Sequence, residues 1–121
     1  TPQFIQDAAA FALNNDEYYV REMRAKYQKR RDLVCSRLAQ MPRLSYLTPE
    51  SGMFIMVNIS AFFKDDKEFA QKLLDAEKLS VLPGSAFGAG TTGHIRLSLV
   101  QPEDVLSEGC NRLERFLKTM S

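Results

Sequence analysis

The sequence predicts an α+β fold: a small, mostly antiparallel sheet of three or four strands, with helices packed chiefly on one face. Two observations support this. Segments with apolar residues three or four positions apart, typical of helices, are separated by short segments with alternating apolar residues, typical of strands. The 121 residues suffice for one hydrophobic core. A long helix near the start is expected to lie alongside it.

The first helix is predicted to begin at Thr1, whose hydroxyl can cap the free amides, with Pro2 in the first turn. We expect its apolar stripe to pack back on the domain or to pair with a second copy of the chain, giving an oligomer. The stripe consists of Phe4, Ile5, Ala8, Phe11 and Ala12.

The second helix is predicted over residues 16–41, with Asp16 as its cap, and is long enough to connect two bodies. Its apolar stripe consists of Tyr19, Met23, Tyr27, Val34, Leu38 and Met41. Basic residues also occur along it, but acidic residues interleave with them and the net charge of the chain is only +1. A solvated face is therefore expected, and no nucleic-acid partner is indicated.

The middle of the chain predicts a short strand at 43–47 and a central strand at 53–59, whose apolar residues lie on both faces. One face of this strand is left for the long helix or a partner domain. A third helix begins at Asp65 and Asp66, where the helix dipole favours carboxylates, and buries Phe69, Leu73 and Leu74. Another strand is predicted at 79–82.

Residues 83–88 form a turn rich in proline and glycine, and the strand that follows carries Arg96. Because residues alternate across a strand, Arg96 shares one face with His94 and Ser98, while the opposite face is apolar. An arginine held in this way can grip a carboxylate through two parallel hydrogen bonds. The last helix starts near 101–104 and buries Leu106, Cys110, Leu113, Phe116, Leu117 and Met120.

Residues 88–93 spell G-x-G-x-x-G, a motif of dinucleotide-binding folds. That motif requires a helix directly after the glycines, whereas here a strand follows, so we interpret it as a flexible loop. His94 is the only histidine, and we expect it to have a surface or hydrogen-bonding role. Cys35 and Cys110 lie within helical patterns and are interpreted as reduced core thiols, which favours a cytoplasmic protein. No apolar run approaches membrane-spanning length, and the first residues do not resemble a secretory signal.

Three segments resemble one known family. Residues 81–99 read V-L-P-G-S-A-F-G-x-G-x-x-G-H-I-R-L-S-L, residues 49–54 read P-x-x-G-x-F, and residues 1–34 read T-P-x-F-x-Q-x-A-A followed by Y-V-x-x-M-R-x-x-Y-x-x-R-R-D-L-V. Together these segments resemble the class I/II aminotransferases of fold type I, which use pyridoxal 5'-phosphate. The resemblance implies that Arg96 binds the substrate α-carboxylate and that Gly52 and Met53 are candidate walls of the substrate pocket.

The resemblance also implies a domain organisation. Residues 1–14 would be the trailing helix of a missing N-terminal cofactor domain, and residues 15–121 the small C-terminal domain, including the connecting helix 16–41. None of the seven lysines lies in the serine-rich context of the family's Schiff-base lysine. We therefore expect no catalytic or cofactor-binding residue and no metal ligand in this fragment. It should be inactive alone and should not bind the cofactor itself.

The resemblance implies that the parent enzyme is a cytoplasmic homodimer of amino-acid metabolism, which transfers amino groups between amino acids and 2-oxo acids. A stand-alone α+β ligand-binding or regulatory module is the alternative. An RNA-binding sheet would need paired exposed aromatics on its central strands, and the Arg96 strand has none.

Overall fold

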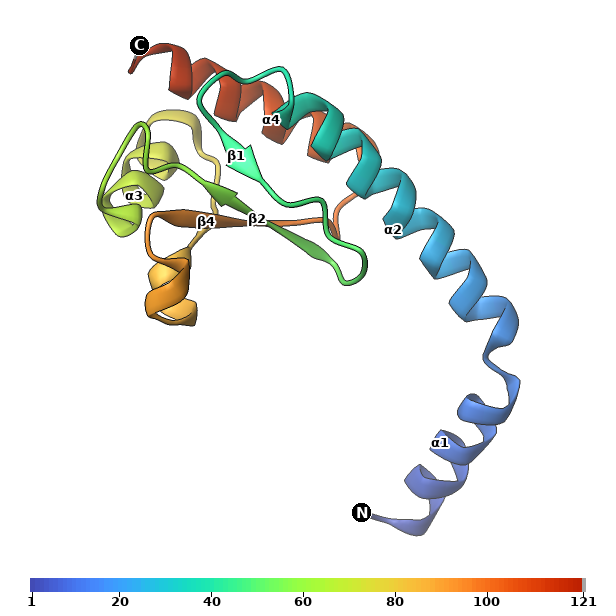
Figure 1. Cartoon of the computed structure of the whole chain (residues 1–121). Coiled ribbons are helices and arrows are strands. Elements are labelled where there is room, and N and C mark those ends of the chain that lie inside the picture. The colour runs from blue at the N-terminus through green and yellow to red at the C-terminus, as the bar shows by residue number, and fades with distance from the viewer. Residues whose placement is uncertain (121) are drawn as a thin grey trace.

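The computed structural model describes residues 1–120 (Figure 1). Its helices are α1 (Gln3–Asn15), α2 (Glu17–Leu38), α3 (Asp66–Glu77) and α4 (Glu103–Lys118). The strands are β1 (Ser45–Tyr46), β2 (Phe54–Asn58), β3 (Leu82–Pro83) and β4 (His94–Ser98). Two short 3-10 turns, Gly84–Phe87 and Ala89–Thr91, lie between β3 and β4. The predicted α+β class is confirmed.

The sheet has four antiparallel strands in the order β1-β2-β4-β3. The predicted central strand is β2, which pairs with both β1 and β4. The strand predicted at 43–47 is shorter than expected, and the one predicted at 79–82 is limited to Leu82 and Pro83. Pro83 lacks a backbone N–H, which suits its place on the edge strand.

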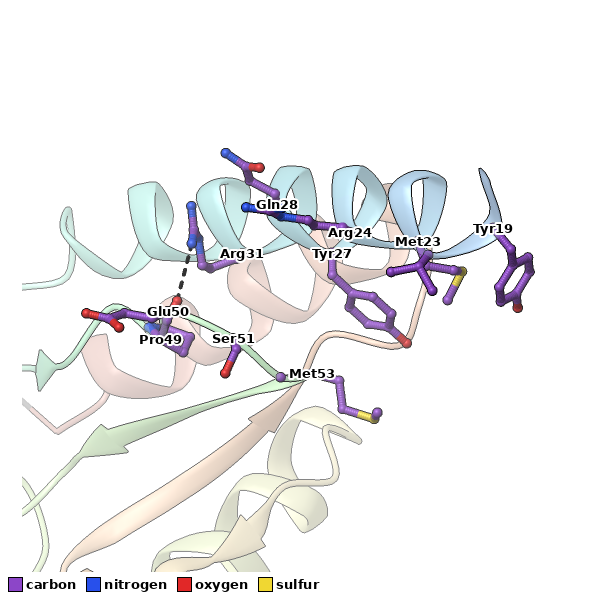
Figure 2. A pocket seen from close by; sticks show the side chains of 12 residues that line it. Tyr19, Met23, Arg24, Tyr27, Gln28, Arg31, Pro49, Glu50, Ser51 and Met53 are labelled. Atoms are coloured by element: carbon purple, nitrogen blue, oxygen red, sulfur yellow. Dashed lines mark hydrogen bonds between the residues drawn. The ribbon is translucent and has the colours of Figure 1, made fainter. Parts of the chain in front are cut away.

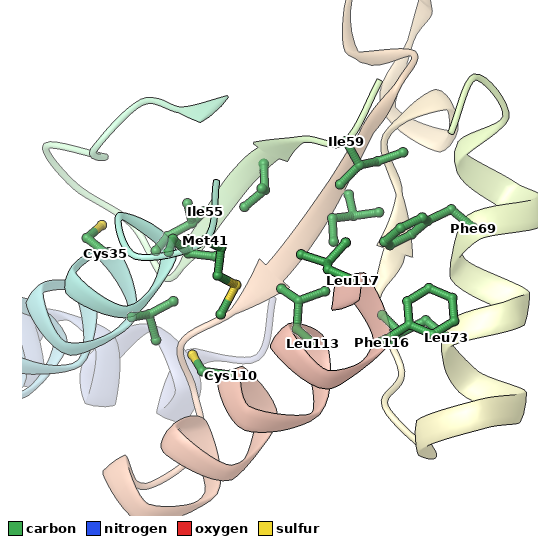
Figure 3. Close-up of a cluster of buried hydrophobic side chains, with 14 of the residues drawn as sticks. Cys35, Met41, Ile55, Ile59, Phe69, Leu73, Cys110, Leu113, Phe116 and Leu117 are labelled. Carbon is green, nitrogen blue, oxygen red and sulfur yellow. The ribbon is translucent and has the colours of Figure 1, made fainter. Parts of the chain in front are cut away.

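The core lies on one face of the sheet, beneath α2, α3 and α4 (Figure 3). From the sheet come Ile55, Val57, Ile59, Ile95 and Leu99, all fully buried. Helices α2, α3 and α4 add apolar residues predicted for their inner faces, though not all of those predicted. Leu74, predicted to be inside, is 40% exposed, because α3 directs Phe69 and Leu73 at the sheet instead. Cys35 and Cys110 are buried free thiols, and burial raises the pKa of both.

Two predicted caps are wrong. The α1 helix has no side-chain cap from Thr1, since the amides of Ile5 and Gln6 donate to the Pro2 carbonyl oxygen at 3.1 and 3.2 Å. The side chain of Asp16 does not cap α2, because its backbone is itself close to helical. By contrast, Asp65 caps α3, accepting from the amides of Lys67 and Glu68.

The α1 helix and the N-terminal part of α2 extend away from the sheet (Figure 1). No residue of α1 is buried, so its apolar stripe does not pack back on the domain. In α2, which ends at Leu38 rather than at residue 41, only Val34, Cys35 and Leu38 are buried. The more N-terminal part of the predicted stripe therefore lies outside the core, with Tyr19 65% exposed.

Candidate functional site

The outer face of the sheet, opposite the core, carries Arg96. Ile95 beside it is fully buried, and alternation along β4 turns Arg96 to the other side, where it is half-buried. The register sets Arg96 between Met56 of β2 and Leu82 of β3, so a paired strand flanks it on each side. Arg96 thus lies on one of the two inner strands of the sheet, on the face opposite the helices that cover the core.

Two phenylalanines hold the Arg96 guanidinium. Its Cζ atom lies 5.1 Å from the ring centroid of Phe54 and 4.5 Å from that of Phe87. Such contacts attract a cation to the ring face without using a conventional acceptor. Within residues 1–120 the Arg96 side chain makes no hydrogen bond or ion pair with an acidic or polar group. The planar N–H donors therefore remain for a ligand or for water.

The loop at residues 84–93 leads into β4 and is fixed by a buried carboxylate. Asp66, only 2% exposed, accepts hydrogen bonds from the Ser85 hydroxyl at 2.6 Å, the Ser85 amide at 3.0 Å and the Gly93 amide at 2.9 Å. Burial alone would raise the pKa of Asp66, but these three hydrogen bonds outweigh it and the pKa is lowered. The predicted turn at 83–88 is therefore tied to Asp66 at Ser85, and the predicted flexible loop at 88–93 is tied to it at Gly93. The segment contains two short 3-10 turns. As predicted, a strand follows its glycines.

A shallow groove of about 400 Å³ lies on the same outer face. Phe54 and Met56, the neighbours of Arg96, line it together with His94. The Nδ1 atom of His94 lies 3.0 Å from the Thr92 carbonyl oxygen, a local contact that fits the hydrogen-bonding role predicted for it. The groove therefore shares Phe54 and Met56 with the surroundings of Arg96, but Arg96 itself does not line it.

Gly52 and Met53 line a larger pocket of about 780 Å³ between α2 and the loop before β2 (Figure 2). The Arg31 guanidinium donates to the Pro49 carbonyl oxygen at 3.3 Å and ties that loop to the helix. Gly52 has φ +86°, a conformation that favours glycine. Arg96 does not line this pocket, so the structure does not unite the three predicted site residues in one cavity.

Sequence reasoning missed Phe87 and Asp66 as parts of the Arg96 environment. The sequence predicted only that Phe54 lies on the second apolar face of its strand, and it predicted no contact of Phe54 with Arg96. The alternation of β2 could have located Phe54 on the outer face, but its contact with Arg96 depends on strand register. Asp66 lies 19 residues from Ser85 and 27 from Gly93 along the chain, and no local pattern predicts such a contact.

The residues present do not fit the cofactor that the resemblance implies. Pyridoxal phosphate needs an amine for its aldehyde and cationic or amide donors for its phosphate. All seven lysines are exposed, and none lines the groove or the pocket beside α2. In residues 1–120 no cluster of histidine, cysteine or acidic side chains could hold a metal ion. None of the helices described is both long and apolar enough to cross a membrane.

Comparison with known proteins gives a consistent result. The sequence pattern of the aminotransferase class I and II family matches residues 1–113. An arginine–pyruvate transaminase of Pseudomonas aeruginosa is 46% identical over 113 residues, covering 93% of this chain and 29% of that protein. An aspartate aminotransferase of Pyrococcus horikoshii is 33% identical, over 95% of this chain and 30% of its own length.

Solved structures agree with the sequence comparison. An aromatic aminotransferase of Pyrococcus horikoshii superposes with a TM-score of 0.89 at 37% identity, over 96% of this chain and 31% of that one. An aspartate aminotransferase of Thermotoga maritima gives a TM-score of 0.80 at 32% identity, covering 92% of this chain and 27% of that one. The chain thus spans about three tenths of the length of the Pseudomonas and Pyrococcus enzymes that it matches in sequence.

Proposed function

The chain belongs to the class I and II aminotransferases, and from that premise we propose that it is the substrate-carboxylate-binding part of a pyridoxal-phosphate-dependent amino-acid aminotransferase. Arg96 is the residue proposed to bind the α-carboxylate. The observation that carries the proposal is the half-buried Arg96 guanidinium, which two aromatic rings hold on the open sheet face while its hydrogen-bond donors have no protein partner in residues 1–120.

The proposed role of Arg96 follows from its geometry. A carboxylate can accept two parallel hydrogen bonds from the guanidinium, each charge-assisted and worth about 1.5 to 3 kcal/mol. The two bonds fix both the position and the rotation of the carboxylate, and hence the direction of the bonds at the substrate Cα. The Phe54 and Phe87 rings limit the movement of the guanidinium without competing for its donors.

We propose that residues 1–14 belong to a cofactor domain and that residues 15–121 form the small domain, which includes the connecting helix predicted at 16–41. Two observations support this division. The match covers only 29% of the length of the Pseudomonas relative, and the apolar face of α1 is exposed. The cofactor lysine and the phosphate-binding groups would then lie outside this chain, which would be inactive alone. Gly52 and Met53 would be pocket walls. We further propose that the intact enzyme is a cytoplasmic homodimer and that it acts on amino acids and 2-oxo acids.

The test is steady-state kinetics of Arg96→Lys in the intact enzyme. Lysine keeps the positive charge but cannot reproduce the planar fork, so we expect KM for the amino donor to rise and kcat to fall. Arg115→Lys, at an exposed arginine of α4 that lines neither the groove nor the pocket beside α2, is the matched control and should leave both unchanged. Unchanged kinetics in Arg96→Lys would refute the assignment.

A further inference from the structure

Asp66 is the only buried polar or charged side chain in residues 1–120. It lies in the first turn of α3, outside the groove and outside the pocket beside α2. Burying a carboxylate costs free energy unless it is hydrogen-bonded, and the hydrogen bonds of Asp66 outweigh that cost. Its hydrogen bonds also fix the geometry of the 84–93 loop, which raises the question of what that loop must hold in place.

The carboxylate joins the two ends of the 84–93 loop. One oxygen, Oδ2, accepts from the amides of both Ser85 and Gly93, and Oδ1 accepts from the Ser85 hydroxyl. Thr91 closes the loop a second time, because its hydroxyl donates to the Gly84 carbonyl oxygen at 2.7 Å. Asp66 and Thr91 therefore both restrain the loop from shifting as a whole.

Both ends of the loop lead to the Arg96 side chain. Two residues after Ser85 comes Phe87, whose ring lies 4.5 Å from the Arg96 Cζ atom. Three residues after Gly93 comes Arg96 itself, in the strand that begins directly after Gly93. Phe87 is 48% exposed and has little packing of its own, so the backbone of the loop decides where its ring lies.

We propose that Asp66 is a positioning residue for carboxylate recognition: by fixing the 84–93 loop it holds Phe87 against Arg96 and sets the direction of the guanidinium. This rests on the proposed function of Arg96. Asp66 lines neither the groove nor the pocket beside α2 and makes no hydrogen bond to Arg96, so its proposed action is through the loop. Loosening the loop should weaken recognition of the carboxylate while leaving the rest of the substrate site unchanged.

The test compares an L-amino acid with the primary amine that lacks only its α-carboxylate, using single-turnover kcat/KM in the intact enzyme. We expect Asp66→Ala to lower the amino-acid-to-amine ratio about tenfold, because a misdirected guanidinium affects only the carboxylate-bearing substrate. Asp66→Asn should retain most of the ratio. Its amide oxygen can accept from both backbone amides, and its NH2 group can donate to the Ser85 hydroxyl.

Asp65→Ala is the matched control. It removes the cap of the same helix at the neighbouring residue without touching the loop, so it should lower the melting temperature and leave the ratio at the wild-type value. A ratio that stays at the wild-type value in Asp66→Ala, with only the melting temperature lowered, would overturn the proposal. So would equal losses of the ratio in Asp65→Ala and Asp66→Ala.

Two further variants keep the outcome interpretable. If Asp66→Ala does not fold, Ser85→Ala removes only the hydroxyl that donates to Oδ1 and should lower the ratio about threefold. An unchanged ratio there overturns the proposal. Arg96→Ala separates the two claims. If it lowers the ratio and Asp66→Ala does not, only the positioning role fails, and if Arg96→Ala leaves the ratio unchanged, the proposed function of Arg96 fails.

Discussion

Gly84, the first residue of the 84–93 loop, has no room for a side chain. A Cβ atom there would collide with the carbonyl oxygen of Thr91 and lie 2.8 Å from that of His94. We expect Gly84→Ala to push the loop from the sheet and to lower the free energy of unfolding by about 2 kcal/mol or more, measured by urea denaturation. Gly90→Ala is the control, since nothing lies within 4 Å of its Cβ position, and a similar loss there would contradict this explanation.

Asp66 also predicts a pH dependence. Its pKa is lowered in the folded state, so the ionised carboxylate stabilises the fold above the ordinary aspartate value of about 4. This contribution is lost as the pH falls from there through the lower folded-state pKa. The difference in free energy of unfolding between wild type and Asp66→Asn should be constant near neutral pH and shrink below about pH 4. Denaturation curves across this range measure it, and a difference that grows on acidification would be inconsistent with the hydrogen bonds described.

At the scale of the element, Gly109 weakens the middle of α4. A Cβ atom there would lie 3.6 Å from Cδ1 of Leu79, an ordinary van der Waals distance, so alanine fits without displacing its neighbour. Gly109→Ala should therefore raise the free energy of unfolding by up to about 1 kcal/mol, because alanine has the higher helix propensity. Urea denaturation of the two proteins gives the value, and a destabilised variant would show that the space is smaller than the structure indicates.

The position of a helix or strand can be predicted where the spacing of apolar residues repeats. It is harder to predict where contacts between residues distant in the sequence determine the structure. Spacing correctly predicts Phe69 and Leu73 inside, whereas Leu74, one position further, is equally apolar but faces outward. Alternation alone assigns Arg96 to its face of the strand. Its contact with Phe87 depends on a loop conformation fixed by Asp66, and no residue near Asp66 in sequence signals that partner.

At the scale of the whole molecule, α1 adds nothing to the core. None of its residues is buried, and Phe4, Phe11 and Leu13 are each at least 70% exposed. Deleting residues 1–15 should therefore leave the urea midpoint unchanged when both chains are measured at a concentration low enough to keep them monomeric. A lowered midpoint would mean that α1 packs on the domain in solution.

The same exposed side chains should drive self-association of the 121-residue chain. We expect sedimentation velocity to show oligomers that dissociate in Phe11→Glu, because the charge would be buried on association. Lys26→Glu, an exposed charge change on α2, is the control and should leave the association intact. A chain that is monomeric at high concentration would contradict this expectation.

The most direct test of the central claim is a crystal structure of the intact enzyme with a bound substrate analogue that carries an α-carboxylate. We predict that both carboxylate oxygens accept hydrogen bonds from the Arg96 guanidinium, which stays between the rings of Phe54 and Phe87. A carboxylate bound away from Arg96, with the guanidinium paired to an aspartate or glutamate of the protein, would contradict the claim.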